Sequence, residues 1–369
     1  MGAVALAGLA WGWYEAGWVR LRTLEIELPA LPPELDGVRI VHLSDFHLGL
    51  PSRGARAVAR GVAWAGDRDP DLVCITGDLV SRPRGEAKLR ELVRTLPRCY
   101  AILGNHDLAI SRDPFSKAVG LRGLEPARLL LDEGAEVEVR GERVWIAGLD
   151  PRSRGQEPRL HQEASLTILL SHFPSVVDRP AAEGFDLVLA GHMHDGQICV
   201  PYPGGKLRLA HPSAPYTHGL YRRGGTVMHV TPGLGTTFVP FRFFARPEAT
   251  ELVLTAERDG DSRSDCPPYN RVVTVPARIA RDVLARYAAD AAQDVEGVRK
   301  LVPDRLRRHG GVRVTHEDEV SIEVHLGVEA GVSIPALGRE LQQRIAEYLE
   351  RMTGTAPSTV DVVVHEIGS

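Results

Sequence analysis

The 369-residue sequence lacks the features that mark disulfide-bonded and nucleic-acid-binding proteins. Its four cysteines (Cys74, Cys99, Cys199 and Cys266) lie far apart and include no Cys-x-x-Cys pair, so no disulfide framework is expected. The formal net charge is −4, whereas binding to nucleic acid would favour a basic surface. Apolar residues at 43% and charged residues at 25% are ordinary for a soluble globular protein, and the length suits two domains. An anionic substrate would therefore need local positive charge, such as metal ions.

The sequence also has no clear membrane-spanning segment, although the N-terminus comes close. Residues 1–14 carry no charged side chain, and apolar character resumes at residues 16–19 after Glu15. A spanning helix needs roughly 20 apolar residues, and this segment lacks the basic start and cleavage site of a secretory signal. Its aromatic residues suit a membrane interface: Trp11, Trp13, Tyr14 and Trp18. We expect residues 1–20 to form a membrane anchor or interfacial helix, with a packed N-terminal helix as the alternative. Arg20 and Arg22 favour the cytoplasmic face.

Strands and helices alternate through the next part of the chain, which is typical of an α/β sheet. Apolar runs predict strands at residues 38–43, 72–76, 100–103, 166–170, 186–190 and 251–255. Helices are predicted at residues 53–66 and 86–96, and a hairpin at residues 136–147. Residues 196–235 are rich in Gly, Pro and aromatic residues and predict a long functional loop region. In α/β sheets ligands bind outside the carboxyl ends of the strands.

Residue types that bind metals follow these predicted strands. They are Asp45 and His47, Asp78, Asn105, His172, and the pair His192 and His194. Histidine, carboxylate and amide ligands without thiolate suit divalent Mn, Fe or Zn, and a carboxylate with two oxygens can bridge two ions. A metal pair about 3.5–4 Å apart neutralises phosphoryl oxygens and provides a nucleophilic water. The set predicts a two-metal phosphoesterase with Asp78 as the bridge, His106 as the proton donor and Asp107 as the residue that orients the His106 ring.

In this order, the motifs resemble the calcineurin-like metallophosphoesterase family over roughly residues 21–257. They are Asp45-x-His47, Gly77-Asp78, Gly104-Asn105-His106-Asp107, His172 and Gly191-His192-x-His194. The resemblance implies two packed mixed β-sheets flanked by helices, with His106 as the catalytic histidine. It also implies that one metal binds Asp45, His47, Asp78 and His194. The other metal would bind Asp78, Asn105, His172 and His192.

Further stretches resemble the bacterial membrane-associated YkuE/YaeI-like branch of this family. They are residues 11–16, 191–198, 232–235 and 240–242. Asp195 departs from that pattern, in which a glycine is expected.

A polar linker is predicted at residues 258–269, followed by a small α+β domain at residues 270–369. Its predicted order is βαββαβ, with strands at 271–275, 311–315, 320–328 and 360–367 and helices at 276–292 and 334–352. Residues 270–367 resemble the alkaline shock protein family, on the stretches 275–280, 295–298 and 352–354. The resemblance implies binding or self-association near the cytoplasmic face of the envelope. A regulatory or stabilising appendage is the alternative.

The resulting hypothesis is a membrane-associated phosphoesterase that hydrolyses a phosphodiester or phosphomonoester. A metal-bound hydroxide would attack phosphorus, and His106 would protonate the leaving oxygen. One alternative is a pyrophosphate hydrolase acting on a lipid-linked nucleotide sugar such as UDP-diacylglucosamine. Another is a non-catalytic envelope scaffold with a structural metal site. Substrate-binding residues are not assigned.

Overall fold

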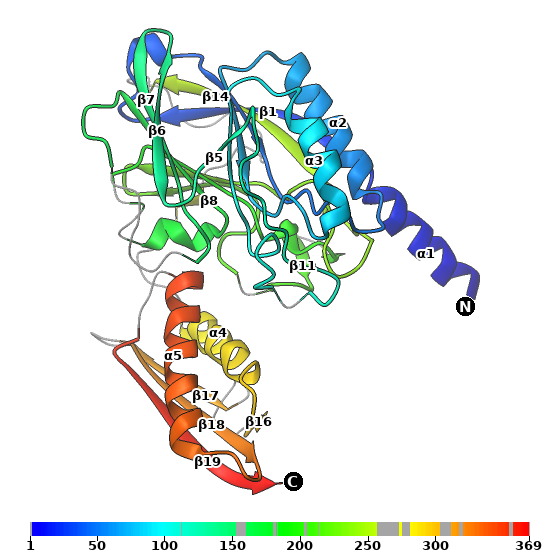
Figure 1. Ribbon diagram of the computed structural model, residues 1–369, viewed down its shortest axis with the longest axis vertical. Coiled ribbons are helices and arrows are strands. Elements are labelled where there is room, and N and C mark those ends of the chain that lie inside the picture. Colours follow the sequence, from blue (N-terminus) through cyan, green and yellow to red (C-terminus); the bar gives the residue numbers. More distant parts are fainter. Residues whose placement is uncertain are drawn as a thin grey trace. The chain divides into compact units, whose positions relative to one another are not determined.

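The first sheet of the N-terminal part is built on three short buried strands that the sequence predicts. In the computed structural model, β2 (Arg39–Leu43), β3 (Leu72–Thr76) and β4 (Cys99–Ile102) are parallel neighbours. Every residue of β3 is buried, as expected for a strand covered on both faces. The sheet has the order β1-β14-β2-β3-β4-β5, and β1 and β14 are labelled beside each other in Figure 1. The remaining strands are β1 (Arg20–Leu28), β14 (Glu248–Ala256) and β5 (Arg128–Leu129).

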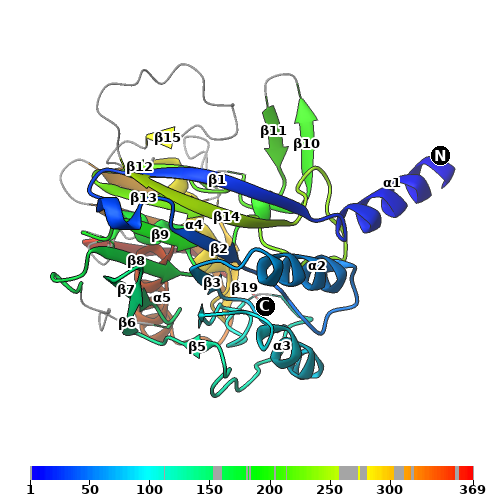
Figure 2. The same cartoon turned by 90° about the horizontal axis from the view of Figure 1, so that it is seen from above.

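Two helices cover one face of this sheet (Figure 2). They are α2 (Gly54–Asp67) and α3 (Glu86–Val93), close to the predicted bounds. The buried residues of α2 recur at helical spacing, so one stripe of the helix faces the sheet. Leu89 and Val93 of α3 join the same apolar cluster as Val73 and Ile75 of β3.

The second sheet has the order β15-β12-β13-β9-β8-β7-β6. Its strands are β6 (Glu133–Val139), β7 (Glu142–Gly148), β8 (Leu166–Ser171), β9 (Leu187–Ala190), β12 (Gly219–Arg223), β13 (Thr226–Val230) and β15 (Val273–Thr274). Apolar residues of both sheets meet in one cluster that includes Cys74, Ile102, Ile168, Leu170 and Leu189. The predicted fold of two packed mixed sheets flanked by helices is confirmed.

The loop region predicted at residues 196–235 is wrong in detail. It contains the hairpin β10 (Cys199–Tyr202) and β11 (Gly205–Arg208), followed by β12 and β13. The many glycines lie in turns between short strands, as at Gly224 (φ +57°). The glycine-rich composition therefore resembles that of a loop. The β10–β11 hairpin projects from the sheets (Figure 2).

The N-terminal helix α1 (Gly2–Glu15) is 14 residues long and extends away from the sheets (Figures 1 and 2). Among the described residues, no helix is long and apolar enough to cross a membrane. The carboxyl end of α1 is nevertheless held in place. The Arg242 amide donates to the Gly12 carbonyl at 3.0 Å, and the Ala245 amide donates to Glu15 Oε1 at 2.8 Å.

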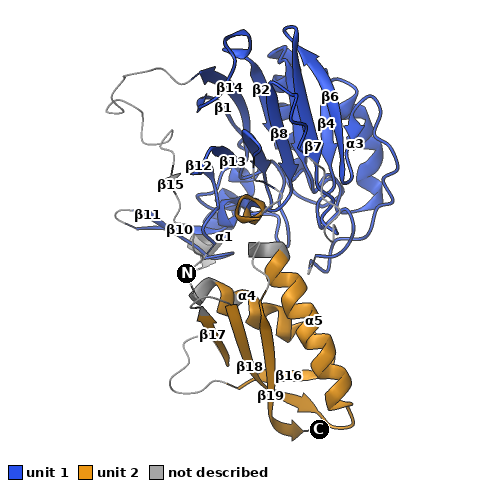
Figure 3. Ribbon diagram, turned by 90° about the vertical axis from the view of Figure 1, so that its left-hand side faces the viewer, with its two compact units in different colours: residues 1–174, 181–275 blue, residues 175–180, 276–369 orange. Residues whose placement is uncertain are grey.

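The chain divides into two units, residues 1–174 with 181–275, and residues 175–180 with 276–369 (Figure 3). The second unit contains α4 (Arg281–Gln293), β16 (Val298–Leu301), β17 (Val312–His316), β18 (Val320–Glu329), α5 (Ile334–Thr353) and β19 (Thr359–Gly368). Its α+β class is confirmed, but the predicted order βαββαβ is wrong. The strand predicted at residues 271–275 appears as β15, which pairs with β12 of the first unit. β16 was missed because Arg299 and Lys300 interrupt its apolar pattern.

The structure describes residues 2–111, 113–152, 160–179, 182, 184–202, 205–212, 214–256, 273–274, 281–302, 311–316, 320–353 and 357–368. The predicted linker at 258–269 lies outside these residues, as does Cys266. Short 3-10 helices are formed by Pro33–Leu35, Pro83–Gly85, Pro174–Asp178 and His194–Gly196.

Candidate metal centre

The predicted metal ligands lie just beyond the carboxyl ends of five parallel strands. Asp45, Asp78 and Asn105 follow β2, β3 and β4 of the first sheet. His172 and His192 follow β8 and β9 of the second sheet. Because the two sheets pack face to face, these ends meet in one place.

Several of these ligands have a backbone conformation that is unfavourable for residues other than glycine. Five have a positive φ: Asp45 (54°), His47 (46°), Asp78 (54°), His192 (70°) and His194 (48°). Such conformations cost of the order of 1–3 kcal/mol each and cluster at functional sites. The sharp turns direct successive side chains into one cluster.

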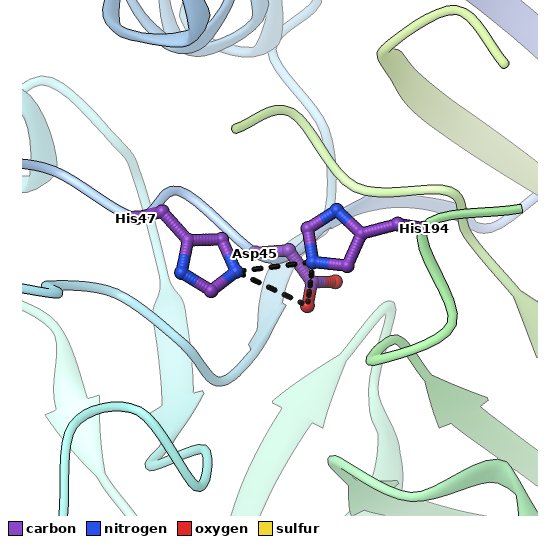
Figure 4. Close-up of side chains that lie close together, drawn as sticks. All are labelled: Asp45, His47 and His194. Carbon is purple, nitrogen blue, oxygen red and sulfur yellow. Dashed lines mark hydrogen bonds and ion pairs between the residues drawn. The ribbon is translucent and has the colours of Figure 1, made fainter. Parts of the chain in front are cut away.

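One group of ligand atoms comes from Asp45, His47 and His194 (Figure 4). The Nε2 atoms of His47 and His194 lie 3.0 Å apart, and Asp45 Oδ1 lies 3.4 Å from His194 Nε2. The other nitrogen of each ring is occupied: His47 Nδ1 lies 2.8 Å from Ser81 Oγ, and His194 Nδ1 lies 3.0 Å from Arg242 Nη2. Two imidazole nitrogens aimed at the same point beside a carboxylate oxygen are an arrangement that a bound cation would satisfy.

A second group comes from Asp78, His172 and His192, with Asn105 beside them. His172 Nε2 lies 2.9 Å from Asn105 Oδ1 and 3.2 Å from His192 Nδ1. His172 Nδ1 donates to the Thr76 carbonyl at 2.8 Å, which leaves Nε2 free to bind a metal. Asp78 Oδ2 lies 3.3 Å from His172 Nε2 and 3.5 Å from His47 Nε2, so this oxygen is shared by both groups.

Electrostatics favour the protonation states that metal binding needs for most ligands. Burial, followed by the neighbouring histidines, holds the pKa values of His47, His192 and His194 well below normal. Burial would raise the pKa of Asp78, but His172 and His106 hold it well below normal. These shifts favour neutral imidazoles and an ionised carboxylate, which are the protonation states that bind a metal ion.

His172 is the exception to this pattern. Burial would lower its pKa, but Asp78 and Asp45 raise it to about 9. Burial raises the pKa of Asp45 to about 6, with His172 opposing the shift. A cation bound here would compete with the His172 proton for the same nitrogen, so its binding would release that proton.

Two glycines make room for the carboxylates. A Cβ on Gly104 would lie 2.1 Å from Asp78 Oδ1, and one on Gly191 would lie 2.5 Å from Asp45 Oδ2. Larger residues at either position would displace a ligand. The glycines of the two sequence motifs are therefore required by the close approach of the side chains.

His106 lies at the edge of the cluster, with Nε2 3.9 Å from Asp78 Oδ2. Its Nδ1 lies 2.6 Å from Ser116 Oγ and 3.8 Å from Asp113 Oδ2. The contact predicted from Asp107 to this ring is not among the hydrogen bonds of the described residues. Instead, Asp107 accepts hydrogen bonds from three backbone amides, those of Leu79, Val80 and Gly104. Asp107 thus braces the loops that follow β3 and β4.

Arg242 is a buried contact of the site whose role the sequence alone does not predict. Its Nη2 lies 3.0 Å from His194 Nδ1 and donates to the Gly235 carbonyl at 2.7 Å. The same side chain donates to the carbonyls of Pro232 and Ala245. Burial lowers its pKa to about 10. The guanidinium therefore fixes the loops around His194, and only its place in the Pro-Phe-Arg motif at 240–242 could have indicated it.

The donor set fits two divalent ions. Carboxylate, imidazole and amide donors without thiolate suit Mn, Fe or Zn, and the shared Asp78 oxygen suits a bridge between two ions. The predicted ligands are all brought together: Asp45, His47, Asp78, Asn105, His172, His192 and His194.

Comparison with known families agrees with this geometry. Residues 38–196 match the calcineurin-like phosphoesterase family, and residues 274–369 match the alkaline shock protein family, which has a cell envelope-related function. The chain is 29% identical over 243 residues to the uncharacterized metallophosphoesterase YkuE of Bacillus subtilis, and the match covers 62% of this chain and 83% of YkuE. It is 28% identical over 260 residues to the phosphodiesterase YaeI of Escherichia coli, covering 66% of this chain and 89% of YaeI.

A vertebrate relative is longer. A transmembrane protein with a metallophosphoesterase domain from Danio rerio is 33% identical over 259 residues, covering 63% of this chain and 57% of that protein. The match spans little more than half of the length of that relative.

Proposed function

We propose that the chain is a phosphoesterase with a dinuclear metal centre, because residues 38–196 match the calcineurin-like phosphoesterase family and the ligands of two ions meet in one cluster. The proposed reaction is hydrolysis of a phosphodiester or phosphomonoester. Two divalent ions would neutralise the phosphoryl oxygens and lower the pKa of the attacking water. One would be held by Asp45, His47, Asp78 and His194. The other would be held by Asp78, Asn105, His172 and His192.

The observation that carries this proposal is the position of Asp78 Oδ2. It lies 3.5 Å from His47 Nε2 and 3.3 Å from His172 Nε2, between the two groups of ligands. A single structural metal would need only one of these groups. Asn105 adds a neutral oxygen, which leaves more of the positive charge for the substrate phosphate.

His106 is the proposed proton donor. Ser116 lies against Nδ1, and Nε2 points towards Asp78 and the ligand cluster. A proton on Nε2 can therefore pass to the oxygen that leaves phosphorus, which is general acid catalysis. Asp113 and Ser116 hold the ring in this orientation, the role first expected of Asp107.

Membrane association is part of the proposal. Helix α1 exposes Leu9, Trp11, Trp13 and Tyr14, and aromatic side chains on a helix of this kind suit a membrane interface. The alkaline shock protein family has an envelope-related function, and one relative is named as a transmembrane protein. The arginines after α1 support the cytoplasmic face, where the C-terminal domain would contact the envelope.

The same exposed aromatic residues favour a second candidate substrate class, a lipid-linked pyrophosphate such as UDP-diacylglucosamine. The ligand geometry serves either reaction, so a comparison of substrates separates them. A non-catalytic scaffold has no support in the described part of the chain, since each predicted ligand lies in the cluster.

The test is hydrolysis of bis(p-nitrophenyl) phosphate and p-nitrophenyl phosphate by manganese-loaded protein, together with metal analysis. We expect two ions per chain and turnover that a chelator abolishes and manganese restores. UDP-diacylglucosamine is assayed in parallel, and faster turnover of it would favour the pyrophosphate. Protein that retains two ions and hydrolyses none of these compounds would contradict the proposed function.

A further inference from the structure

The three hydroxyl groups around His106 each adjoin an exposed apolar side chain. Ser111 and Ser116 lie 3.3 Å and 2.6 Å from Nδ1, and Thr237 Oγ1 lies 3.4 Å from Nε2. Their sequence neighbours are Ile110, Phe115 and Phe238, which are 42%, 48% and 49% exposed, and Val239 beside them is 39% exposed. We call Ile110, Phe115, Phe238 and Val239 the apolar rim.

The backbone of the apolar rim is tied to the site. The Ile110 amide donates to the carbonyl of Asn105 at 3.0 Å. The amides of Phe115 and Phe238 both donate to the buried carboxylate of Asp113, at 2.9 Å and 3.3 Å. Hydrogen bonds to these groups therefore fix the loops that carry the exposed side chains of the apolar rim.

The apolar rim continues onto other exposed apolar segments. Gln197 Nε2 donates to the carbonyls of Thr237 and Val239, which connects the rim to the β10–β11 hairpin. That hairpin and the residue after it expose Val200, Tyr202, Leu207 and Leu209. Trp13 of α1 packs against Phe241 with ring centroids 6.3 Å apart. Four segments distant in sequence thus present exposed apolar side chains, and these contacts connect the hairpin and α1 to the segment that carries Phe238 and Val239.

Charge indicates what this surface contacts. The segments 2–18, 105–121, 195–212 and 236–247 contain four acidic residues, Glu15, Asp107, Asp113 and Asp195, and all four are buried. Basic side chains on the same segments reach solvent at Lys117, Lys206 and Arg246. Aromatic and aliphatic side chains among basic residues, without exposed carboxylates, complement an anionic lipid surface.

We propose that the apolar rim contacts a lipid bilayer and that the leaving group of the reaction is a lipid alcohol. This inference rests on the proposed function, because His106 identifies the side of the site where the leaving oxygen departs. Water forms the new bond to phosphorus and releases one proton, and the bond from phosphorus to the lipid oxygen breaks. That oxygen takes the proton from His106 Nε2, and the proton released by the water restores His106. The products are a lipid alcohol, which stays in the bilayer, and a water-soluble phosphate.

The test compares a lipid with its soluble counterpart. Manganese-loaded full-length protein is assayed on dioleoyl phosphatidic acid in vesicles of phosphatidylcholine and phosphatidylglycerol, and on glycerol 3-phosphate, which has the same leaving oxygen without acyl chains. We expect kcat/KM for the lipid to be at least tenfold higher. In F115S/F238S the ratio of the two values should fall at least tenfold, and binding to the vesicles should weaken in a sedimentation assay.

The control is Leu160→Ser, which changes an apolar side chain of similar exposure (36%) outside these segments and should alter neither the ratio nor vesicle binding. Thermal unfolding and metal content check that each variant folds. Hydrolysis of bis(p-nitrophenyl) phosphate without preference for the lipid would overturn the inference and leave the proposed function standing. Conversion of a dimer to a monomer by F115S/F238S would also overturn it, since the rim would then bind a second copy. Metal-loaded protein that hydrolyses no ester would remove the proposed function as well.

Discussion

Both units of the chain bring histidines and carboxylates into contact on a β-sheet, but among the described residues only those of the first unit form groups of three that could hold a metal ion. These groups are the two described above and a third, made of His47, Asp78 and His106. In the second unit, His325 Nδ1 lies 2.6 Å from His365 Nε2, and both residues lie within strands. Side chains within a strand alternate between faces, whereas residues beyond the ends of parallel strands can turn towards one point. The histidines of the candidate metal centre all follow strand ends in this way.

The largest expected effect comes from removing the shared ligand. In Asp78→Asn we expect metal affinity to fall by more than about 100-fold, because changes to the partners of metal ligands alone cost 10–100-fold. Turnover should become undetectable. The matched control is Glu323→Gln in the second unit, because Glu323 is a carboxylate that contacts a histidine, His325. Isothermal titration with manganese measures both, and equal affinities for the two variants would break the contrast between the units.

A smaller effect is expected at the proton donor. His106→Ala should lower kcat by about 10²–10⁴, the usual contribution of general acid catalysis, while two metals per chain are retained. His325→Ala in the second unit should leave kcat unchanged. Metal analysis accompanies the kinetics. Loss of metal from His106→Ala would show that this histidine is a ligand, and unchanged kcat would exclude it from the reaction.

The buried arginine is expected to affect stability as well as metal binding. Arg242→Met would leave the carbonyls of Pro232, Gly235 and Ala245 without their donor. Leaving buried polar groups unpaired costs about 1–3 kcal/mol each, so for three carbonyls we expect the free energy of unfolding to fall by at least about 3 kcal/mol. Arg143→Met, at an exposed ion pair with Glu163, should change it by less than about 1 kcal/mol. Urea unfolding compares the two, and equal effects would contradict the structural role of Arg242.

The effect that is smallest at neutral pH, and appears only on acidification, concerns a buried pair of histidines in the first unit. His42 and His229 face each other with Nδ1 atoms 2.8 Å apart. Burial lowers the pKa of His229 to about 3 and that of His42 well below normal. The unfolded chain binds more protons between about pH 6.5 and 3, so stability should fall as the pH decreases through this range. Each histidine contributes up to about 1.4 kcal/mol per pH unit to the slope of the free energy of unfolding against pH. His229→Gln should flatten the slope, and an unchanged slope would show that the pair does not govern it.

Much of the first unit follows from sequence because its signals are local. The β-branched runs of β2, β3 and β9 and the polar residues after them appear directly in the order of residues. The strand β1 was missed because its alternating charged residues resemble a surface segment until β14 pairs with it. The roles of Asp107 and Arg242 could not be read from sequence either. Each depends on which backbone groups lie nearby once distant loops have packed.

The most direct test of the two-metal centre is anomalous diffraction from a manganese-loaded crystal. Two peaks about 3.5–4 Å apart on either side of the Asp78 carboxylate, and none in the second unit, are expected. A single peak, or peaks away from Asp78, would contradict the account.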